Sequence, residues 1–322
     1  MLFLEIAIGV VGLLAGGELL VRGASRLAVK LGMSPLVVGV TIVGFGTSVP
    51  ELVTCLEAAW RGAPGIAIGN IVGSNIANIL LILGVAAAIR PFVCSRAAVV
   101  RDGGLVIGTA ILFTLFAMTG ELERWMGGLF VTGLVVYLAW LYRSERAGAC
   151  EHVDAGGAMA IGDEDEATQN GGRSLRDIGL VVVGIGLVIG GANFLVDGSV
   201  ELARMFDISE DVIGLSLVAL GTSLPELATS MIAAFRKHSE IALGNVLGSN
   251  VYNVLGIGGI TALVHPIPVS QDMLRVDFPI MVAVSVAMVL MARSRGRLSR
   301  TEGFLLLGAY VVYIGMLYRG VA

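Results

Sequence analysis

The chain has 322 residues, of which 56% are apolar and only 14% charged, and its mean hydropathy is +0.88. These values exceed those of soluble globular domains and exclude a water-soluble protein. The net charge of −4 gives no reason to expect a nucleic-acid partner, and the three cysteines form neither a disulfide framework nor a metal-binding spacing.

Apolar stretches of roughly 18 residues or more follow one another along the chain, each long enough to cross a bilayer. The first lacks a positive n-region and a small-residue cleavage site, so we interpret it as a span and not as a signal peptide. Arg22, Arg26 and Lys30 are expected in the loop that follows it. The sequence predicts an all-α polytopic protein with ten transmembrane helices at 2–21, 34–60, 65–89, 99–118, 125–142, 175–200, 209–235, 240–264, 276–292 and 302–318.

The chain contains an internal repeat. Residues 39–84 and 214–259 align without a gap at a constant offset of 175, and 23 of the 46 aligned pairs are identical. Each copy carries Gly-Thr-Ser-x-Pro-Glu, from Gly46 and Gly221, and then Gly-Asn-x-x-Gly-Ser-Asn-x-x-Asn. Polar and ionisable groups within apolar spans are costly and usually functional, so two copies predict one binding site built from two halves.

The repeat divides the chain into a five-helix repeat at 1–142, a cytoplasmic linker at 143–174 and a second five-helix repeat at 175–322. Because five spans is an odd number, the second half must be inserted upside down, which predicts inverted-topology repeats. The linker contains the acidic run 163–166 but lacks the ligand spacing of an EF-hand. We therefore favour a flexible connection over a regulatory cation sensor.

The distribution of basic residues predicts the orientation in the cell (inner) membrane. Of the 21 Lys and Arg residues, sixteen fall on the side that receives the linker, which the positive-inside rule makes cytoplasmic. Both termini are then outside. At the 175 offset Arg22 corresponds to Asp197 and Arg26 to Glu201, as expected for a position that faces opposite sides in the two halves. The other side holds Arg61, Arg124, Arg204, Arg275 and Arg319.

Proline interrupts the second and seventh spans. Pro50 has no backbone N–H and clashes with the carbonyl four residues earlier, which frees the backbone around Gly46, and Gly44 adds flexibility. Pro225 repeats the arrangement, with Ala219 in the place of Gly44. Polar backbone within a membrane is tolerated where it lines a cavity, and broken helices of this kind expose carbonyls to cations in transporters.

Side chains on the same helix faces complete the predicted site. Thr47 and Glu51 are four residues apart, as are Ser74 and Asn78 on the next span, and a short turn makes the two spans an antiparallel hairpin. The hairpin can bring Glu51 opposite Ser74 and Asn78. The second copy supplies Thr222, Glu226, Ser249 and Asn253 in the same way.

This set of groups offers only oxygen ligands. Neither motif contains a histidine, which argues against zinc, copper or iron. Two carboxylates and several carbonyls suit Ca²⁺ and balance its charge, Na⁺ could use subsets of the same oxygens, and Mg²⁺ is less favoured because it dehydrates reluctantly. The alternatives are helix packing for the hydroxyls and amides, and a protonated or paired state for the two glutamates.

At these motifs the chain resembles the calcium/cation antiporter superfamily, close to the prokaryotic sodium/calcium exchangers. The resemblance implies secondary active exchange of Ca²⁺ for Na⁺ by alternating access, with no cofactor and no obligatory protein partner besides the lipid bilayer. It implies paired carboxylates at Glu51 and Glu226. It further implies backbone carbonyls of Thr47, Thr222, Gly44 and Ala219, hydroxyls of Ser48, Ser223, Ser74 and Ser249, and amides of Asn78 and Asn253 as site groups.

One residue departs from that family. Exchangers of this type commonly carry an aspartate where this chain has Asn253, so the site holds two carboxylates instead of three. A Ca²⁺/H⁺ antiporter, or an exchanger for another cation, is therefore the alternative. A channel would need an oligomeric ring of ligands, and no catalytic constellation of an enzyme is present. The glycine-rich first and sixth spans are expected to pack closely and slide across a core of spans 2, 3, 7 and 8, with packing alone as the alternative.

Overall fold

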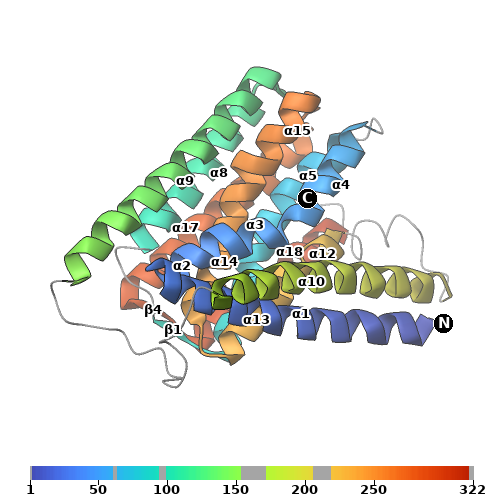
Figure 1. Cartoon of the computed structure of the whole chain (residues 1–322). Coiled ribbons are helices and arrows are strands. Elements are labelled where there is room, and N and C mark those ends of the chain that lie inside the picture. The colour runs from blue at the N-terminus through green and yellow to red at the C-terminus, as the bar shows by residue number, and fades with distance from the viewer. Residues whose placement is uncertain (1, 61–63, 94–98, 154–171, 206–218, 319–322) are drawn as a thin grey trace.

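The computed structural model describes residues 2–60, 64–93, 99–153, 172–205 and 219–318, which form a bundle of long helices (Figure 1). The first half contains α1 (Leu2–Leu31), α2 (Pro35–Val38), η1 (Gly39–Val43), α3 (Gly44–Thr47), α4 (Val49–Trp60), α5 (Pro64–Ala77), η2 (Asn78–Leu83), α6 (Gly84–Ile89), β1 (Phe92–Val93), η3 (Val99–Gly103), α8 (Gly104–Ala117), β2 (Glu121–Leu122) and α9 (Arg124–Val153). The second contains α10 (Gly172–Met205), α12 (Ala219–Thr222), α13 (Leu224–Phe235), α14 (Ser239–Val251), η5 (Tyr252–Gly258), α15 (Gly259–Val264), β3 (Ile267–Pro268), α16 (Gln271–Arg275), α17 (Asp277–Arg295), β4 (Arg297–Leu298) and α18 (Arg300–Tyr318).

Within the described residues, nine helical segments are long and apolar enough to cross a membrane. Of the expected seventh span, 209–235, residues 209–218 lie outside the described part, and α13 is a shorter apolar helix. The count of ten therefore stays a prediction. Of the expected linker, residues 143–153 continue α9 and 172–174 begin α10, while 154–171 are outside the described part.

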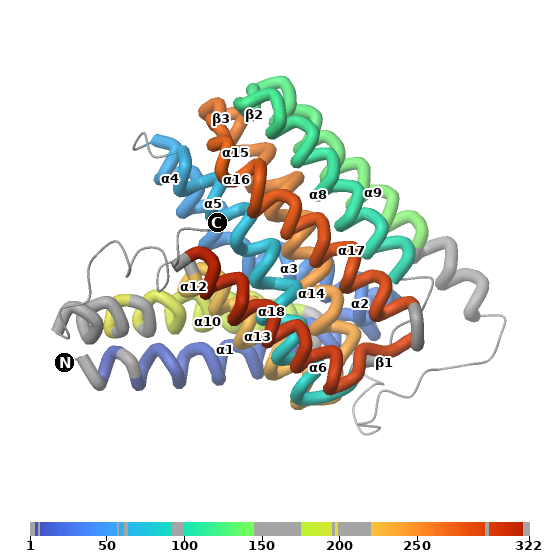
Figure 2. The backbone as a smooth tube through the Cα atoms, turned by 180° about the vertical axis from the view of Figure 1, so that it is seen from behind, coloured from blue at the N-terminus to red at the C-terminus, as the bar shows by residue number. Residues whose placement is uncertain are grey.

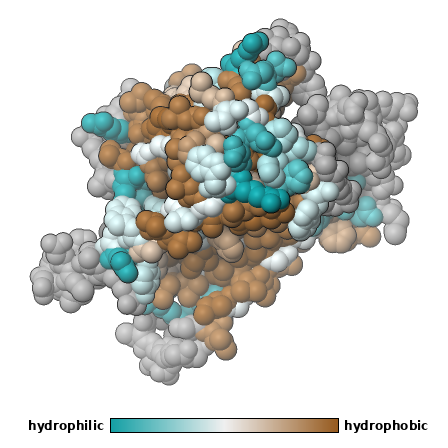
Figure 3. All heavy atoms as spheres, turned by 90° about the horizontal axis from the view of Figure 1, so that it is seen from above, coloured by the Kyte–Doolittle hydropathy of each residue, from teal (hydrophilic) through white to brown (hydrophobic). Residues whose placement is uncertain are grey.

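The lipid-facing helices place apolar side chains on the outside of the bundle, and brown areas extend over the surface in Figure 3. Leu305 and Val311 of α18, for example, are 61% and 70% exposed. The interior is built around α14 and α5, and every residue of α14 from Ile241 onward is buried. Polar motif residues on these two helices are therefore enclosed by protein instead of lipid.

The end predicted for the first span is wrong. α1 continues for ten residues beyond position 21, so Arg22, Arg26 and Lys30 lie on its last turns and not in a loop. The helix continues because each charge has a partner: Arg22 Nε lies 2.6 Å from Glu18 Oε1, and both Arg26 and Lys30 form ion pairs with Asp177 of α10. Long basic side chains at a helix end can satisfy their charge while their stems cover apolar surface.

α1 and α10 run antiparallel and side by side, as both views of the backbone show (Figures 1 and 2). Glycines let their backbones touch. A Cβ built on Gly184 would lie 2.6 Å from Leu20 N, and one on Gly16 would lie 2.7 Å from Val188 N. Small residues are what permit such close approach between helices in a membrane. The two glycine-rich spans therefore form one closely packed pair.

Elements related by the 175 offset have the same geometry. Asn78 begins the π-helical turn η2, and Asn253 lies in the π-helical turn η5. The helices that follow end at Arg90 (φ −144°, ψ 123°) and His265 (φ −142°, ψ 124°). Two short antiparallel ladders, β1 with β4 and β2 with β3, each join a strand from one half to a strand from the other. The halves are interlocked through both ladders.

A buried aspartate–tyrosine pair occurs once in each half. Tyr137 Oη of α9 donates to Asp102 Oδ1 of η3 at 3.3 Å, and Tyr313 Oη of α18 donates to Asp277 Oδ1 of α17 at 2.9 Å. The pairs differ in one respect. Arg101 also donates to both oxygens of Asp102, at 2.8 and 2.9 Å, whereas Tyr313 is the one side-chain donor to Asp277 within the described residues.

Tyr313→Phe should therefore destabilise the protein more than Tyr137→Phe. Removing the Tyr313 hydroxyl deprives a buried carboxylate of its side-chain donor, which costs about 1–3 kcal/mol, whereas Arg101 still satisfies Asp102 after Tyr137→Phe. Thermal unfolding of the two variants in the same detergent measures the difference. Equal losses of stability in both variants would contradict the conclusion that Asp277 depends on Tyr313 more than Asp102 depends on Tyr137.

Candidate ion-binding site

Two helix breaks lie at the centre of the site. α3 ends at Thr47 and α4 begins at Val49, with Ser48 between them at φ −84° and ψ 5°. The second break repeats this geometry, with Ser223 at φ −90° and ψ 3° between α12 and α13. Because proline follows each break by two residues, the carbonyls of Gly46 and Gly221 have no N–H donor four residues ahead. The sequence motif therefore produces the break expected from its proline.

The two glutamates are held across the repeat interface. Ser48 Oγ donates to Glu226 Oε1 at 3.0 Å, and Ser223 Oγ donates to Glu51 Oε1 at 3.3 Å. Both glutamates are almost fully enclosed, with exposed fractions of 2% for Glu51 and 1% for Glu226. Each carboxylate is thus oriented by the serine at the helix break of the opposite half.

The next pair of serines extends the same crossed network. Ser48 Oγ lies 3.2 Å from Ser249 Oγ of α14, and Ser223 Oγ lies 3.3 Å from Ser74 Oγ of α5. The structure therefore brings four hydroxyls next to the two carboxylates. Ser74 does lie near Glu51, as the hairpin predicts, but they are linked through Ser223 of the other half.

Several oxygens and one nitrogen in this cluster are buried without a hydrogen-bond partner in the described part of the chain. They are Glu51 Oε2, Glu226 Oε2, Asn78 Oδ1 and both side-chain polar atoms of Asn253. Buried polar atoms are nearly always paired, so such a concentration at one place marks a site for a ligand or ordered water. Asn78 and Asn253 also sit in π-helical turns, which are frequent at functional sites.

The remaining residues of the predicted set lie around the breaks. Thr47 is buried and Thr222 is half-buried, each as the last residue of its short helix. Gly44 packs against α14, where a Cβ on it would lie 3.4 Å from Gly248 Cα. Ala219 begins α12, the start of the described part of this segment.

Sequence reasoning did not assign Asn70 and Asn245, which the structure places beside the site. Thr47 Oγ1 lies 3.2 Å from Asn245 Oδ1, and Thr222 Oγ1 lies 3.2 Å from Asn70 Oδ1. Their identity in the two copies of the motif was a visible signal. Nothing in the spacing showed that each one would contact the opposite repeat.

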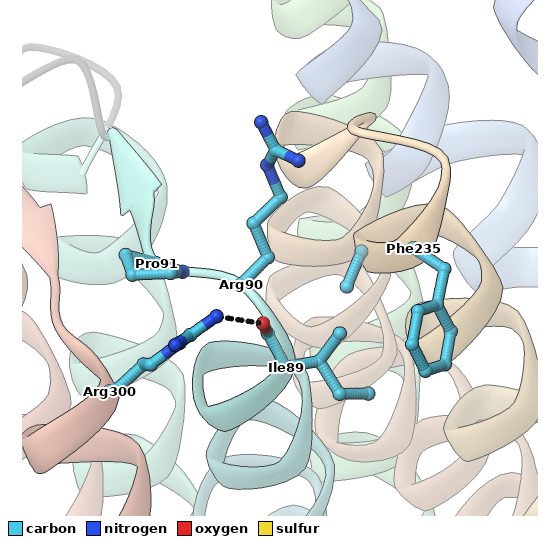
Figure 4. A pocket seen from close by; sticks show the side chains of 6 residues that line it. Ile89, Arg90, Pro91, Phe235 and Arg300 are labelled. Carbon is cyan, nitrogen blue, oxygen red and sulfur yellow. Dashed lines mark hydrogen bonds between the residues drawn. The ribbon is translucent and has the colours of Figure 1, made fainter.

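The pocket in Figure 4 is separate from this cluster. It is open and has a volume of about 380 Å³, and its walls come from the ends of α6 and α13 and the beginning of α18. Arg300 Nη2 donates to the Ile89 carbonyl at 3.3 Å and so caps the end of α6. None of the polar site residues described above lines this pocket.

Comparison with known proteins places these features in a family. The family described as sodium/calcium exchanger protein matches residues 1–143 and 177–319. The sodium/calcium exchanger MaX1 of Methanosarcina acetivorans is 35% identical over 345 aligned positions, covering 98% of each chain. The inner membrane protein YrbG of Escherichia coli is 32% identical, also over 98% of each chain.

Solved structures agree with this assignment. A structure of the sodium-calcium exchanger NCX_Mj soaked with 10 mM Na⁺ and zero Ca²⁺ matches with a TM-score of 0.84 at 30% identity. The match covers 98% of this chain and 100% of that one. A structure of the same exchanger soaked with 10 mM Na⁺ and 10 mM Sr²⁺ gives a TM-score of 0.83. The chain is therefore a member of the sodium/calcium exchanger family, a multi-pass membrane transporter and not an enzyme.

Proposed function

We propose that the chain exchanges Ca²⁺ for Na⁺ by alternating access at the site formed by Glu51 and Glu226. The observation that carries the proposal is the crossed arrangement in which each glutamate is oriented by the other half's serine, while its second oxygen has no hydrogen-bond partner among the residues that the structure describes. Two buried carboxylates suit a divalent cation, whose charge they balance.

Competition for the same oxygens would produce the exchange. Ca²⁺ requires six to eight oxygen ligands, and the carboxylates, hydroxyls and freed carbonyls of both halves supply them. Na⁺ ions would use subsets of these groups, so Ca²⁺ and Na⁺ would not occupy the site together. An empty site with two ionised, buried carboxylates would be costly to carry across the barrier, which suppresses uncoupled movement.

Movement of α1 and α10 is the proposed step that changes access. These helices pack on each other through glycines, and α1 also contacts α13, where a Cβ on Gly17 would lie 3.1 Å from Ile232 Cγ1. Small residues on a helix surface permit such close contact between helices in a membrane. We propose that the pair moves as a unit across the helices that hold the site.

The same proposal includes the orientation in the membrane. The excess of basic residues on the side of the 143–174 linker supports a cytoplasmic linker and external termini. The related Escherichia coli protein is described as an inner membrane protein, which supports the same membrane for this chain.

A Ca²⁺/H⁺ antiporter is the second candidate, and Asn253 favours it. The asparagine removes one negative charge from the position where the resemblance implies an aspartate, so the site has fewer charges with which to hold several Na⁺ ions. Glutamates can carry protons, and two of them would suffice for a proton-coupled cycle.

Radiolabelled Ca²⁺ uptake into proteoliposomes separates the two candidates. Vesicles that contain the purified chain are loaded with Na⁺ and diluted into Na⁺-free medium, and a parallel set receives only a pH gradient. We expect uptake that needs the Na⁺ gradient. Uptake driven by the pH gradient alone would assign the chain to the Ca²⁺/H⁺ class, and no uptake with either gradient would refute Ca²⁺ as the substrate.

A further inference from the structure

Asn245 of α14 is held in one orientation by its surroundings. Its Nδ2 donates to Ser230 Oγ at 2.9 Å and to the Glu226 carbonyl at 3.2 Å, and its exposed fraction is zero. A carbonyl can only accept a hydrogen bond, so the amide nitrogen must face it. The Asn245 Oδ1 atom consequently faces Thr47 Oγ1 of the opposite repeat, 3.2 Å away.

Asn70 of α5 occupies the equivalent position in the first repeat, with one change. Its Oδ1 accepts from Thr222 Oγ1 at 3.2 Å, again across the repeat interface, and its Nδ2 donates to Cys55 Sγ at 3.3 Å. Cys55 stands at the position that Ser230 occupies in the second repeat. The two halves therefore share a crossed threonine–asparagine contact but differ in the group that anchors the asparagine.

These contacts act at the helix breaks. Thr47 and Thr222 are the last residues of α3 and α12, directly before the breaks at Ser48 and Ser223. We propose that Asn70 and Asn245 are positioning residues that fix each break, and with it the backbone carbonyls offered to the ion, against the opposite repeat. The inference rests on the proposed ion exchange, and neither asparagine needs to touch the ion.

Other asparagines nearby do not have this arrangement. Asn75 is also buried, but its Nδ2 donates at 2.7 Å to the Ile71 carbonyl of its own helix. Asn250 repeats that local bond with the Val246 carbonyl at 2.7 Å. Asn75 therefore offers a control in which a buried amide is lost without loss of a contact between repeats.

The different anchoring groups predict that the side chain of Asn245 is held more firmly than that of Asn70. A thiol sulfur is a weaker acceptor than a hydroxyl oxygen, so Cys55 holds Asn70 less firmly than Ser230 holds Asn245. In addition, Asn245 has a second anchor in the Glu226 carbonyl. Asn245→Ala should therefore impair ion binding more than Asn70→Ala.

A double-mutant cycle tests whether Asn245 acts through Thr47. The variants are Thr47→Val, Asn245→Ala and their combination, and the Ca²⁺ concentration for half-maximal uptake and the maximal rate are measured in proteoliposomes. Each single change should raise that concentration about tenfold, corresponding to about 1.4 kcal/mol, with a smaller effect on the maximal rate. The double variant should be no worse than the more affected single variant, because both remove the same contact.

The control cycle pairs Thr47→Val with Asn70→Ala, which belong to different contacts. Their effects on the Ca²⁺ concentration for half-maximal uptake should multiply. In Asn75→Ala that concentration should stay within about twofold of the wild-type value. Multiplying effects in the Thr47–Asn245 cycle would overturn the inference. If Asn245→Ala does not fold, Ser230→Ala replaces it in the cycle, because it removes one of the two groups that anchor the amide nitrogen of Asn245.

The melting temperature of the ion-free protein separates this inference from the proposed function. Coupling between Thr47→Val and Asn245→Ala in that measurement depends on the contact and not on the transported ion. If the cycle shows coupling but the wild-type protein neither takes up Ca²⁺ nor is stabilised by it, Ca²⁺ transport is refuted while the Thr47–Asn245 contact stands. Ca²⁺ uptake by wild type without coupling in either readout would refute the positioning role alone.

Discussion

Glu51→Gln should abolish Ca²⁺ uptake, with a loss of at least about 100-fold, and Glu226→Gln should do the same. Glutamine keeps the shape of the side chain and can still accept from Ser223 Oγ, so the helix break should survive. One of the two negative charges that balance the divalent ion is lost, and leaving a buried charge without its partner costs about 3–5 kcal/mol. Initial uptake rates in the proteoliposome assay measure the effect.

The same variants should have a second, opposite effect on stability. Two buried carboxylates that face one site destabilise the ion-free protein, so each glutamine variant should melt at a higher temperature than wild type without ions. Ca²⁺ should raise the melting temperature of wild type but not of the variants, because a ligand stabilises only the state that binds it.

Glu18→Gln is the matched control. Glu18 also lies in a membrane-spanning segment, on α1, but it accepts from Arg236 Nε at 2.7 Å and from Arg22 Nε at 2.6 Å. We expect uptake close to wild type in this variant. A loss in Glu18→Gln as large as in Glu51→Gln would show that any missing carboxylate stops transport, and would remove the special role of the central pair.

Gly184→Ala should separate α1 from α10 and strongly impair transport. The added methyl group would lie 2.6 Å from Leu20 N and 2.9 Å from Gly16 O, and both of those atoms belong to the backbone of α1. Backbone cannot move aside as a flexible side chain can, so the helices must shift apart. Overpacking of this kind costs about 1–3 kcal/mol, and it should lower the melting temperature and the maximal rate of uptake.

Gly186→Ala provides the control two residues away on the same helix. Gly186 is exposed, and apart from its chain neighbours and the backbone of its own helix no atom of the described residues lies within 4 Å of a Cβ built on it. Its alanine variant should insert, melt and transport as wild type does. If Gly184→Ala and Gly186→Ala behaved alike, contact between the two backbones would not control the stability or the movement of the pair.

Much of the fold and the composition of the candidate site could be predicted from the chain alone. The spans follow from local hydropathy, and the helix breaks follow from Pro50 and Pro225, whose effect on the backbone is independent of tertiary context. The repeat is read from identity at a fixed offset. The end of α1 could not be predicted in this way, because Lys30 and Arg26 continue the helix through ion pairs with Asp177, a residue about 150 positions away.

The partners within the site were also beyond sequence reasoning. The hairpin predicted from the sequence places Glu51 opposite Ser74, but the hydrogen bond to Glu51 comes from Ser223 of the other repeat. Asn70 and Asn75 look alike in the motif, and only the structure shows that Asn70 reaches Thr222 while Asn75 bonds to its own helix.

The sequence by itself determined which groups this protein places in the membrane: two glutamates, the hydroxyls and amides around them, and a proline two residues after each break. These are properties of single positions and of their spacing. The tertiary structure decided which of these groups meet, because Ser48 contacts Glu226 and Thr47 contacts Asn245 only when the two halves face each other. Such contacts depend on the packing of residues about 180–200 positions apart, which no local pattern encodes.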